Sequence, residues 1–182
     1  MNKETGFTLV EVIAALVLVG ILAALTGVGL VTGVKGYLFA RENNVLAQKA
    51  QMALNRLNRE LSMITNITSY TAAPGQIVYQ NLTGAHVIGF IAADGELKLI
   101  NGTTAPTTNT GDILIDQVSG FTVACYKDLA TSTPWNGGEN IKSLFFITIT
   151  LSLQRNDGGP DQVFTTTINP RNTGIIAGPI GS

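Results

Sequence analysis

The chain has 182 residues, of which 45% are hydrophobic and only 13% are charged, a charge content that is low for an ordinary soluble domain. The formal net charge is −1, so no excess of positive charge indicates attraction to nucleic acid. Cys125 is the only cysteine, which excludes an intrachain disulfide. The length suits one domain with an appendage, or one slightly large domain.

The apolar residues are concentrated near the N-terminus. Between Phe7 and Val34 the only ionisable residue is Glu11. This run is longer than the roughly 20 apolar residues that cross a bilayer as a helix, and about twice as long as the apolar part of a secretory signal. An uncleaved single-pass anchor fits the length better than a signal peptide. Neither the anchor nor the signal peptide explains Glu11, because burying a carboxylate at the centre of a membrane helix costs about 2.5–3.5 kcal/mol of free energy.

The order of residues around Glu11 is specific. A short charged leader ends in Gly6, Phe7 follows, and Thr, Leu and Val lead to Glu11 and the apolar run. This order resembles the processing site of type IV prepilins with a class III leader, and the match is close over residues 1–24. The resemblance implies that a prepilin peptidase removes residues 1–6 by cutting between Gly6 and Phe7. It also implies that the new amine of Phe7 is N-methylated.

The same resemblance implies a role for Glu11 in assembly. The amine of Phe7 would be a cation at the membrane depth of Glu11 in a neighbouring subunit, and pairing would set the register between the two helices. The alternative is that Glu11 reaches the membrane interface by itself. The implied partners are the prepilin peptidase, other pilin or pseudopilin subunits, the inner-membrane assembly machinery and membrane lipid.

The helix is expected to continue beyond the membrane. Residues 37–64 contain neither proline nor glycine. Apolar residues recur there at the spacing of an amphipathic helix: Leu46, Ala50, Ala53, Leu54, Leu57, Leu61 and Ile64. We expect a transmembrane and filament-core helix over residues 7–34 and an amphipathic continuation over residues 35–65. The junction contains Gly27, Gly29, Gly33 and Gly36. These glycines fit either close helix packing or a stretch that loosens in the filament, and similarity to related filaments favours loosening.

Residues 66–182 have the pattern of a β-rich globular head. Candidate strands are 76–80, 85–92, 96–100, 113–118, 121–126, 141–154 and 162–169, separated by Gly, Pro, Asn, Asp and Thr clusters. From residue 143 to residue 154 apolar side chains alternate with largely polar ones, which predicts a half-buried strand. The turn residues 156–161 then predict an antiparallel return. The predicted fold class is α+β and type IV pilin-like, with a long N-terminal helix packed on a mostly antiparallel sheet.

Two further segments carry weaker resemblances. Residues 54–61 are similar to the helix of W-type minor pilins and J-type pseudopilins. Residues 164–172 are similar to the C-terminal strand of some prepilin-like proteins. Both favour a minor component of a filament.

Few residues carry recognisable chemistry. His86, the only histidine, lies in a strand-like run and is expected to be structural, so a histidine-based triad lacks its parts. Cys125 is expected to be a buried small hydrophobe rather than a reactive thiol. Asp157 and Asp161 fit a plain turn better than a calcium loop. Trp135 is either an interface contact or a plug over the sheet. No cofactor, metal or catalytic group is predicted.

The expected function is therefore that of a non-enzymatic minor pilin or pseudopilin in a type IV pilus or a type II secretion pseudopilus. It would sit in the bacterial inner membrane with its head outside the cytoplasm, and then in a periplasmic or extracellular filament. The alternative is an uncleaved single-pass anchor that carries a ligand-binding domain. A secreted enzyme with a misread signal peptide is a third possibility, which the absence of catalytic groupings disfavours.

Overall fold

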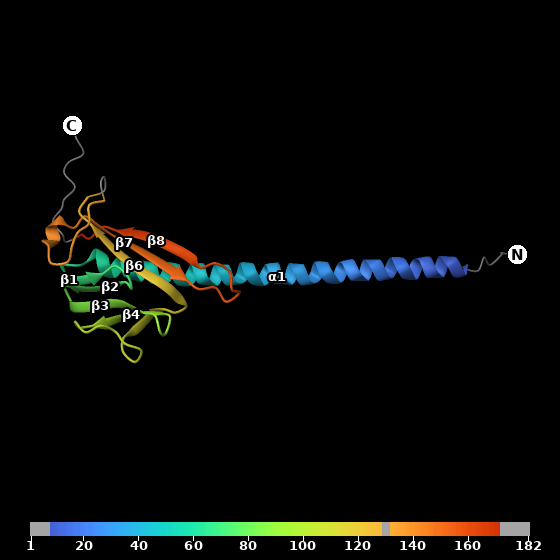
Figure 1. Cartoon of the computed structure of the whole chain (residues 1–182), viewed down its shortest axis with the longest axis horizontal. Coiled ribbons are helices and arrows are strands. Elements are labelled where there is room, and N and C mark those ends of the chain that lie inside the picture. Colours follow the sequence, from blue (N-terminus) through green and yellow to red (C-terminus); the bar gives the residue numbers. More distant parts are fainter. Residues whose placement is uncertain (1–7, 129–131, 172–182) are drawn as a thin grey trace, which may run out of the picture. The chain divides into compact units, whose positions relative to one another are not determined.

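The computed structural model describes residues 8–128 and 132–171, and the chain divides into two compact units, Met1–Asn44 and Val45–Ser182. Helix α1, Leu9–Ser62, supplies the described elements of the first unit and continues into the second (Figure 1). All described strands belong to the second unit. The long N-terminal helix expected from the sequence is confirmed.

Helix α1 passes through its four central glycines without a break. A Cβ atom added at Gly29 or Gly33 would meet nothing within 4 Å, so the structure itself does not require glycine there. The hydroxyls of Thr26 and Thr32 donate to the carbonyl oxygens of Leu22 and Val28, at 2.8 and 3.0 Å. Such bonds bend or weaken helices slightly. Loosening of this region in a filament stays a prediction.

The described residues after α1 form two antiparallel sheets (Figure 1). The larger has the order β1-β2-β3-β4-β5 and the smaller the order β6-β7-β8. The strands are β1 (Asn66–Thr71), β2 (Gln76–Asn81), β3 (Gly84–Ile91), β4 (Glu96–Asn101), β5 (Asp112–Ile115), β6 (Val118–Tyr126), β7 (Phe146–Leu153) and β8 (Gln162–Ile168). A single 3₁₀ turn, η1 (Ile141–Ser143), precedes β7. The predicted α+β architecture is confirmed.

One strand was not predicted, and two predicted strands need correction. Strand β1 was not predicted, because Ile67 is its only buried residue and the sequence around it is polar. The predicted strand 141–154 is wrong at its start, where the Asn140 side chain accepts a bond from the Lys142 backbone N–H at 3.0 Å and caps η1. The predicted strand 113–118 merges the end of β5 with the start of β6. Gln117 separates them, because its φ of 60° turns the chain.

The alternation predicted for β7 is confirmed. Ile147, Ile149, Leu151 and Leu153 are fully buried, whereas the two threonines and the serine between them are half-buried. Strand β7 lies between β6 and β8, so it has a partner on each side. Phe146 is also buried and stacks on Tyr126, with ring centroids 4.8 Å apart.

One hydrophobic core joins the helix to both sheets. The predicted apolar stripe of α1 faces it, with Leu57 and Leu61 fully buried against residues of β2, β4, β6 and β7. Backbone bonds also link the sheets, including one of 2.8 Å from the Gly75 N–H to the Phe121 carbonyl. A Cβ at Gly75 would lie 2.5 Å from a ring carbon of Phe121, so this close approach requires glycine.

Trp135 is a plug in the core and not an exposed contact. Its side chain is fully buried, and its indole N–H donates to the Asn140 carbonyl at 3.2 Å. The ring stacks on Tyr70 at 6.2 Å between centroids, and the Tyr70 hydroxyl donates to the Trp135 carbonyl at 2.7 Å. The loop predicted around residue 135 therefore contributes its aromatic side chain to the core.

Lys98 is the buried charge that the sequence did not reveal. Its side chain is 4% exposed and pairs with Glu96 at 3.0 Å. The ammonium group also donates to the carbonyls of Thr107 and Thr108, at 3.3 and 2.8 Å. These bonds satisfy the desolvated cation and hold the loop between β4 and β5 against β4.

Candidate functional site

The predicted processing site lies at the start of the chain. Gly6 and Phe7 are outside the described residues, which begin at Thr8. Glu11, the third predicted site residue, lies in the first turn of α1. The described part of the site is therefore the beginning of this helix and its surface.

Thr8 starts the helix. Its carbonyl oxygen accepts bonds from the N–H groups of Glu11 and Val12, at 3.1 and 3.3 Å. Its hydroxyl also accepts from the Glu11 N–H at 3.3 Å. Thr-x-x-Glu is the sequence of a capping box, in which the first side chain satisfies an N–H that has no partner within the helix. This signal was present in the sequence and assigns Thr8 a role that the sequence analysis missed.

Glu11 is a carboxylate on an otherwise apolar surface. Its side chain is exposed, and within residues 8–128 and 132–171 it forms no hydrogen bond or ion pair. A negative charge in the first turn is favourable because it faces the positive end of the helix dipole. That interaction alone is worth about 0.3–1 kcal/mol, less than the cost of placing a carboxylate in a membrane. The helix end therefore offsets only part of the cost that a carboxylate would have at the centre of a membrane helix.

The apolar surface around Glu11 is not covered by any residue of the ranges 8–128 and 132–171. The most apolar 18-residue window of α1 has a mean hydropathy of 2.6, and none of it is buried. Large apolar side chains are exposed along it, including Leu9, Val10, Ile13, Leu16, Val17, Ile21, Leu22 and Leu25. In length and composition α1 is sufficient to cross a membrane. Exposed apolar surface of this extent marks contact with lipid or with another protein.

The other candidates lie in the second unit, outside this region. His86 is half-buried, and its Nδ1 lies 2.9 Å from the Asn101 side-chain oxygen. Its Nε2 lies 3.1 Å from the Asn81 side-chain oxygen and 3.0 Å from the Thr83 hydroxyl. Among the residues that the structure describes, no carboxylate bonds to the ring, as one would in a catalytic triad. These contacts agree with a structural role.

Cys125 is buried, as predicted, with 1% of its surface exposed. Burial raises the pKa of its thiol to about 12, so the reactive thiolate is scarce at neutral pH.

We expect the folded chain in detergent to resist alkylation of Cys125 by a maleimide at neutral pH, and the urea-unfolded chain to react completely. The thiol ionises near its ordinary pKa in the unfolded chain, but only near 12 in the folded chain. The contribution of this group to the free energy of unfolding is therefore fully present below the ordinary pKa. It is lost as the pH rises from that value towards the folded pKa. Intact mass after a timed exposure to maleimide measures the reaction. Rapid labelling of the folded chain would contradict this burial.

The Asp157 turn is a hairpin connection closed by an internal ion pair. The Arg155 guanidinium engages both carboxylate oxygens of Asp157, with Nε 2.9 Å from Oδ1. The Gly159 N–H also donates to Oδ1, at 3.0 Å. The bond from Arg155 lowers the pKa of Asp157 below its ordinary value. Asp157 is thus already engaged, and no cluster of three potential metal ligands occurs in the described part of the chain.

Comparison with protein families gives one match. Residues 1–27 match the family described as the prokaryotic N-terminal methylation motif. None of the curated proteins and none of the solved structures that were compared matches the chain. The matched residues include the predicted cleavage positions Gly6 and Phe7, the helix-starting Thr8, and Glu11. The chain thus carries an N-terminal methylation motif with a class III prepilin leader at the start of a long apolar helix, an arrangement consistent with a type IV pilin-like protein.

Proposed function

We propose that this chain is a non-enzymatic subunit of a pilus-type filament, either a minor pilin or a pseudopilin. A prepilin peptidase removes residues 1–6, the new amine of Phe7 is methylated, and the subunit assembles through α1. One observation carries the proposal: the methylation motif of residues 1–27 includes the start of an apolar helix surface that no described residue buries.

The exposed apolar part of α1 has two successive environments under this proposal. Before assembly it spans the inner membrane, with the β-rich head outside the cytoplasm. After assembly, contacts with the helices of other subunits replace contacts with lipid. Both environments cover the apolar surface that would otherwise face water.

Glu11 acts in assembly by pairing with the amine of Phe7 in a neighbouring subunit. Two observations support this role. The Glu11 side chain has no partner within the described residues. The sequence from residue 7 to residue 34 contains no Lys, Arg or His that could serve within the membrane. A cleaved and methylated N-terminus remains a cation, so it supplies the charge that the apolar run lacks.

The head is proposed to belong to a minor component, which initiates, caps or decorates a type IV pilus or a type II secretion pseudopilus. The similarity of residues 54–61 to W-type minor pilins and J-type pseudopilins supports this assignment. In the structure this segment carries Leu57 and Leu61, which anchor α1 in the core.

Mass spectrometry of the N-terminal peptide from the native membrane or filament fraction tests the proposal. We expect a chain that begins at Phe7 and carries one added methyl group. An intact Met1 would contradict processing and favour the membrane-anchored ligand-binding domain. A mature N-terminus beyond Gly27 would instead indicate a secreted protein.

A further inference from the structure

The core-facing side of the five-stranded sheet changes from apolar to polar at one end. Ile77 pairs with Ile88, and Ile88 with Leu99, and all three side chains are buried. In the next row on the same face, Tyr79 pairs with His86, and His86 with Asn101. Side chains on one face of a strand recur with a period of two, so these polar groups occupy positions that would otherwise extend the core. Polar residues at core positions break the usual apolar pattern, and such breaks are expected at functional sites.

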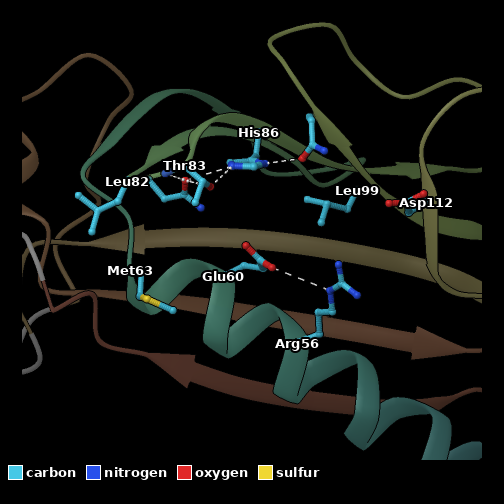
Figure 2. A pocket seen from close by; sticks show the side chains of 10 residues that line it. Arg56, Glu60, Met63, Leu82, Thr83, His86, Leu99 and Asp112 are labelled. Atoms are coloured by element: carbon cyan, nitrogen blue, oxygen red, sulfur yellow. Dashed lines mark hydrogen bonds and ion pairs between the residues drawn. The ribbon is translucent and has the colours of Figure 1, made fainter.

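A cleft lies where the sheet becomes polar. Its volume is about 320 Å³, within the range of small-molecule sites. Figure 2 shows the side chains that line it. One wall is a flank of α1, where Arg56, Glu60 and Met63 follow one another at helical spacing. The opposite wall is the sheet and the β2–β3 turn, which carries Leu82 beside Thr83. The structural contacts of His86 therefore form part of the wall of a cleft.

His86 fixes two amides at this wall. The Asn81 side-chain oxygen accepts bonds from the backbone N–H groups of Thr83 and Gly84, at 2.8 and 3.2 Å, which identifies this atom as the oxygen. His86 contacts that oxygen and also the side-chain oxygen of Asn101. The Asn81 oxygen is thus engaged, so the amide nitrogen of Asn81 remains available as a donor. A neutral imidazole has a single N–H and cannot donate to both amides, so Asn101 is not counted as a second free donor.

Three charged groups of the cleft also have unused hydrogen-bonding capacity. The Arg56 guanidinium approaches Glu60 only to 3.9 Å, so most of its N–H groups stay available. Glu60 accepts one long bond, of 3.4 Å, from the Tyr79 hydroxyl. The Asp112 side chain forms no bond within the part of the chain that the structure describes. The cleft thus presents donors and acceptors together, with one guanidinium beside two carboxylates.

The donors, acceptors and charges of the cleft together indicate which class of ligand it would bind. An anion would meet the carboxylates of Glu60 and Asp112, and a cation would meet the Arg56 guanidinium. A ligand of either charge therefore meets a like charge in the cleft, and a neutral ligand does not. A hydroxyl group both donates and accepts, which matches amide and guanidinium donors beside carboxylate acceptors. The C–H surface of a sugar ring can lie on Met63 and Leu82, which are 48% and 84% exposed. We propose that this cleft binds a neutral sugar residue, either free or at the end of a glycan.

Saturation-transfer NMR on the full chain in lipid nanodiscs tests the proposal. The probes are glucose, galactose, mannose and N-acetylglucosamine. We expect transfer to at least one of them, with a dissociation constant weakened about tenfold or more by the double variant Arg56→Ala, Asp112→Ala. Both side chains are on the surface of their elements, so the variant is expected to fold, and circular dichroism verifies this. A response to hexoses alone supports an exopolysaccharide-like source, and one to N-acetylglucosamine alone supports a cell-wall-like source.

The double variant Arg59→Ala, Asp161→Ala is the matched control. It removes the same two charges, but neither residue lines the cleft. Sugar binding should be unchanged in this control. Three results would overturn the proposal. The first is no saturation transfer to any of the sugars, and the second is an equal weakening of sugar affinity in both double variants. The third is displacement of the bound sugar by trilysine at a lower concentration than a second neutral sugar requires. The last result would assign the cleft to a cationic peptide.

Discussion

Replacing Glu11 with alanine is expected to leave cleavage between Gly6 and Phe7 intact and to prevent incorporation of the subunit into filaments. In the proposed pair, the variant leaves a neighbour's amine without its counter-charge in an apolar environment. Removing one partner of a buried ion pair costs about 3–5 kcal/mol. At 1.4 kcal/mol for each factor of ten, incorporation should fall by roughly a hundredfold or more.

Immunoblots of membrane and sheared-filament fractions measure this effect. Cleavage is read from the size of the membrane-bound form, and incorporation from the amount in filaments. Glu11→Gln is the matched variant, because it keeps the size and polarity of the side chain but removes its charge, and it should also fail to assemble. Asp161→Ala, an acid removed from an exposed turn, should assemble normally. Normal incorporation of the Glu11→Gln protein would refute the charge pairing.

Replacing Trp135 with alanine is expected to lower the free energy of unfolding of the head by about 3–5 kcal/mol. The indole is fully buried, so the substitution leaves a cavity beside Tyr70 in addition to removing apolar contacts. It also removes the bond from the indole N–H to the Asn140 carbonyl. This loss is large compared with the total stability of an ordinary domain, about 5–15 kcal/mol.

Urea unfolding of the full chain in mild detergent, followed by circular dichroism, measures the change. Fluorescence is unsuitable because Trp135 is the only tryptophan. Leu82→Ala is the control, since that side chain is 84% exposed and its removal should change stability by no more than about 0.5 kcal/mol. If Trp135→Ala cost as little as the control, the loop would not be packed as described.

Local order and periodicity made part of this protein predictable. The sequence from Gly6 to Glu11 indicated the motif that the family match reports for residues 1–27. The spacing of Leu57, Leu61 and their neighbours predicted the buried face of α1, and alternation predicted the inner face of β7. These signals lie within a few residues of one another, because helix and strand periods are properties of a continuous segment.

Which polar and aromatic residues are buried, and which side chains meet, depends on contacts between distant segments. Tyr70 and Trp135 are separated by 65 positions, and nothing near either residue indicates that they stack. Strand β1 and the burial of Lys98 likewise depend on partners from other segments. The cleft arises because sheet register places Asn101 beside His86, and folding brings Arg56 to the same place. The N-terminal motif, the helix and the general α+β class could be predicted from the order of residues alone. Non-local packing determined the plug and the cleft, since pairing across strands and layers is set by the whole core rather than by any one segment.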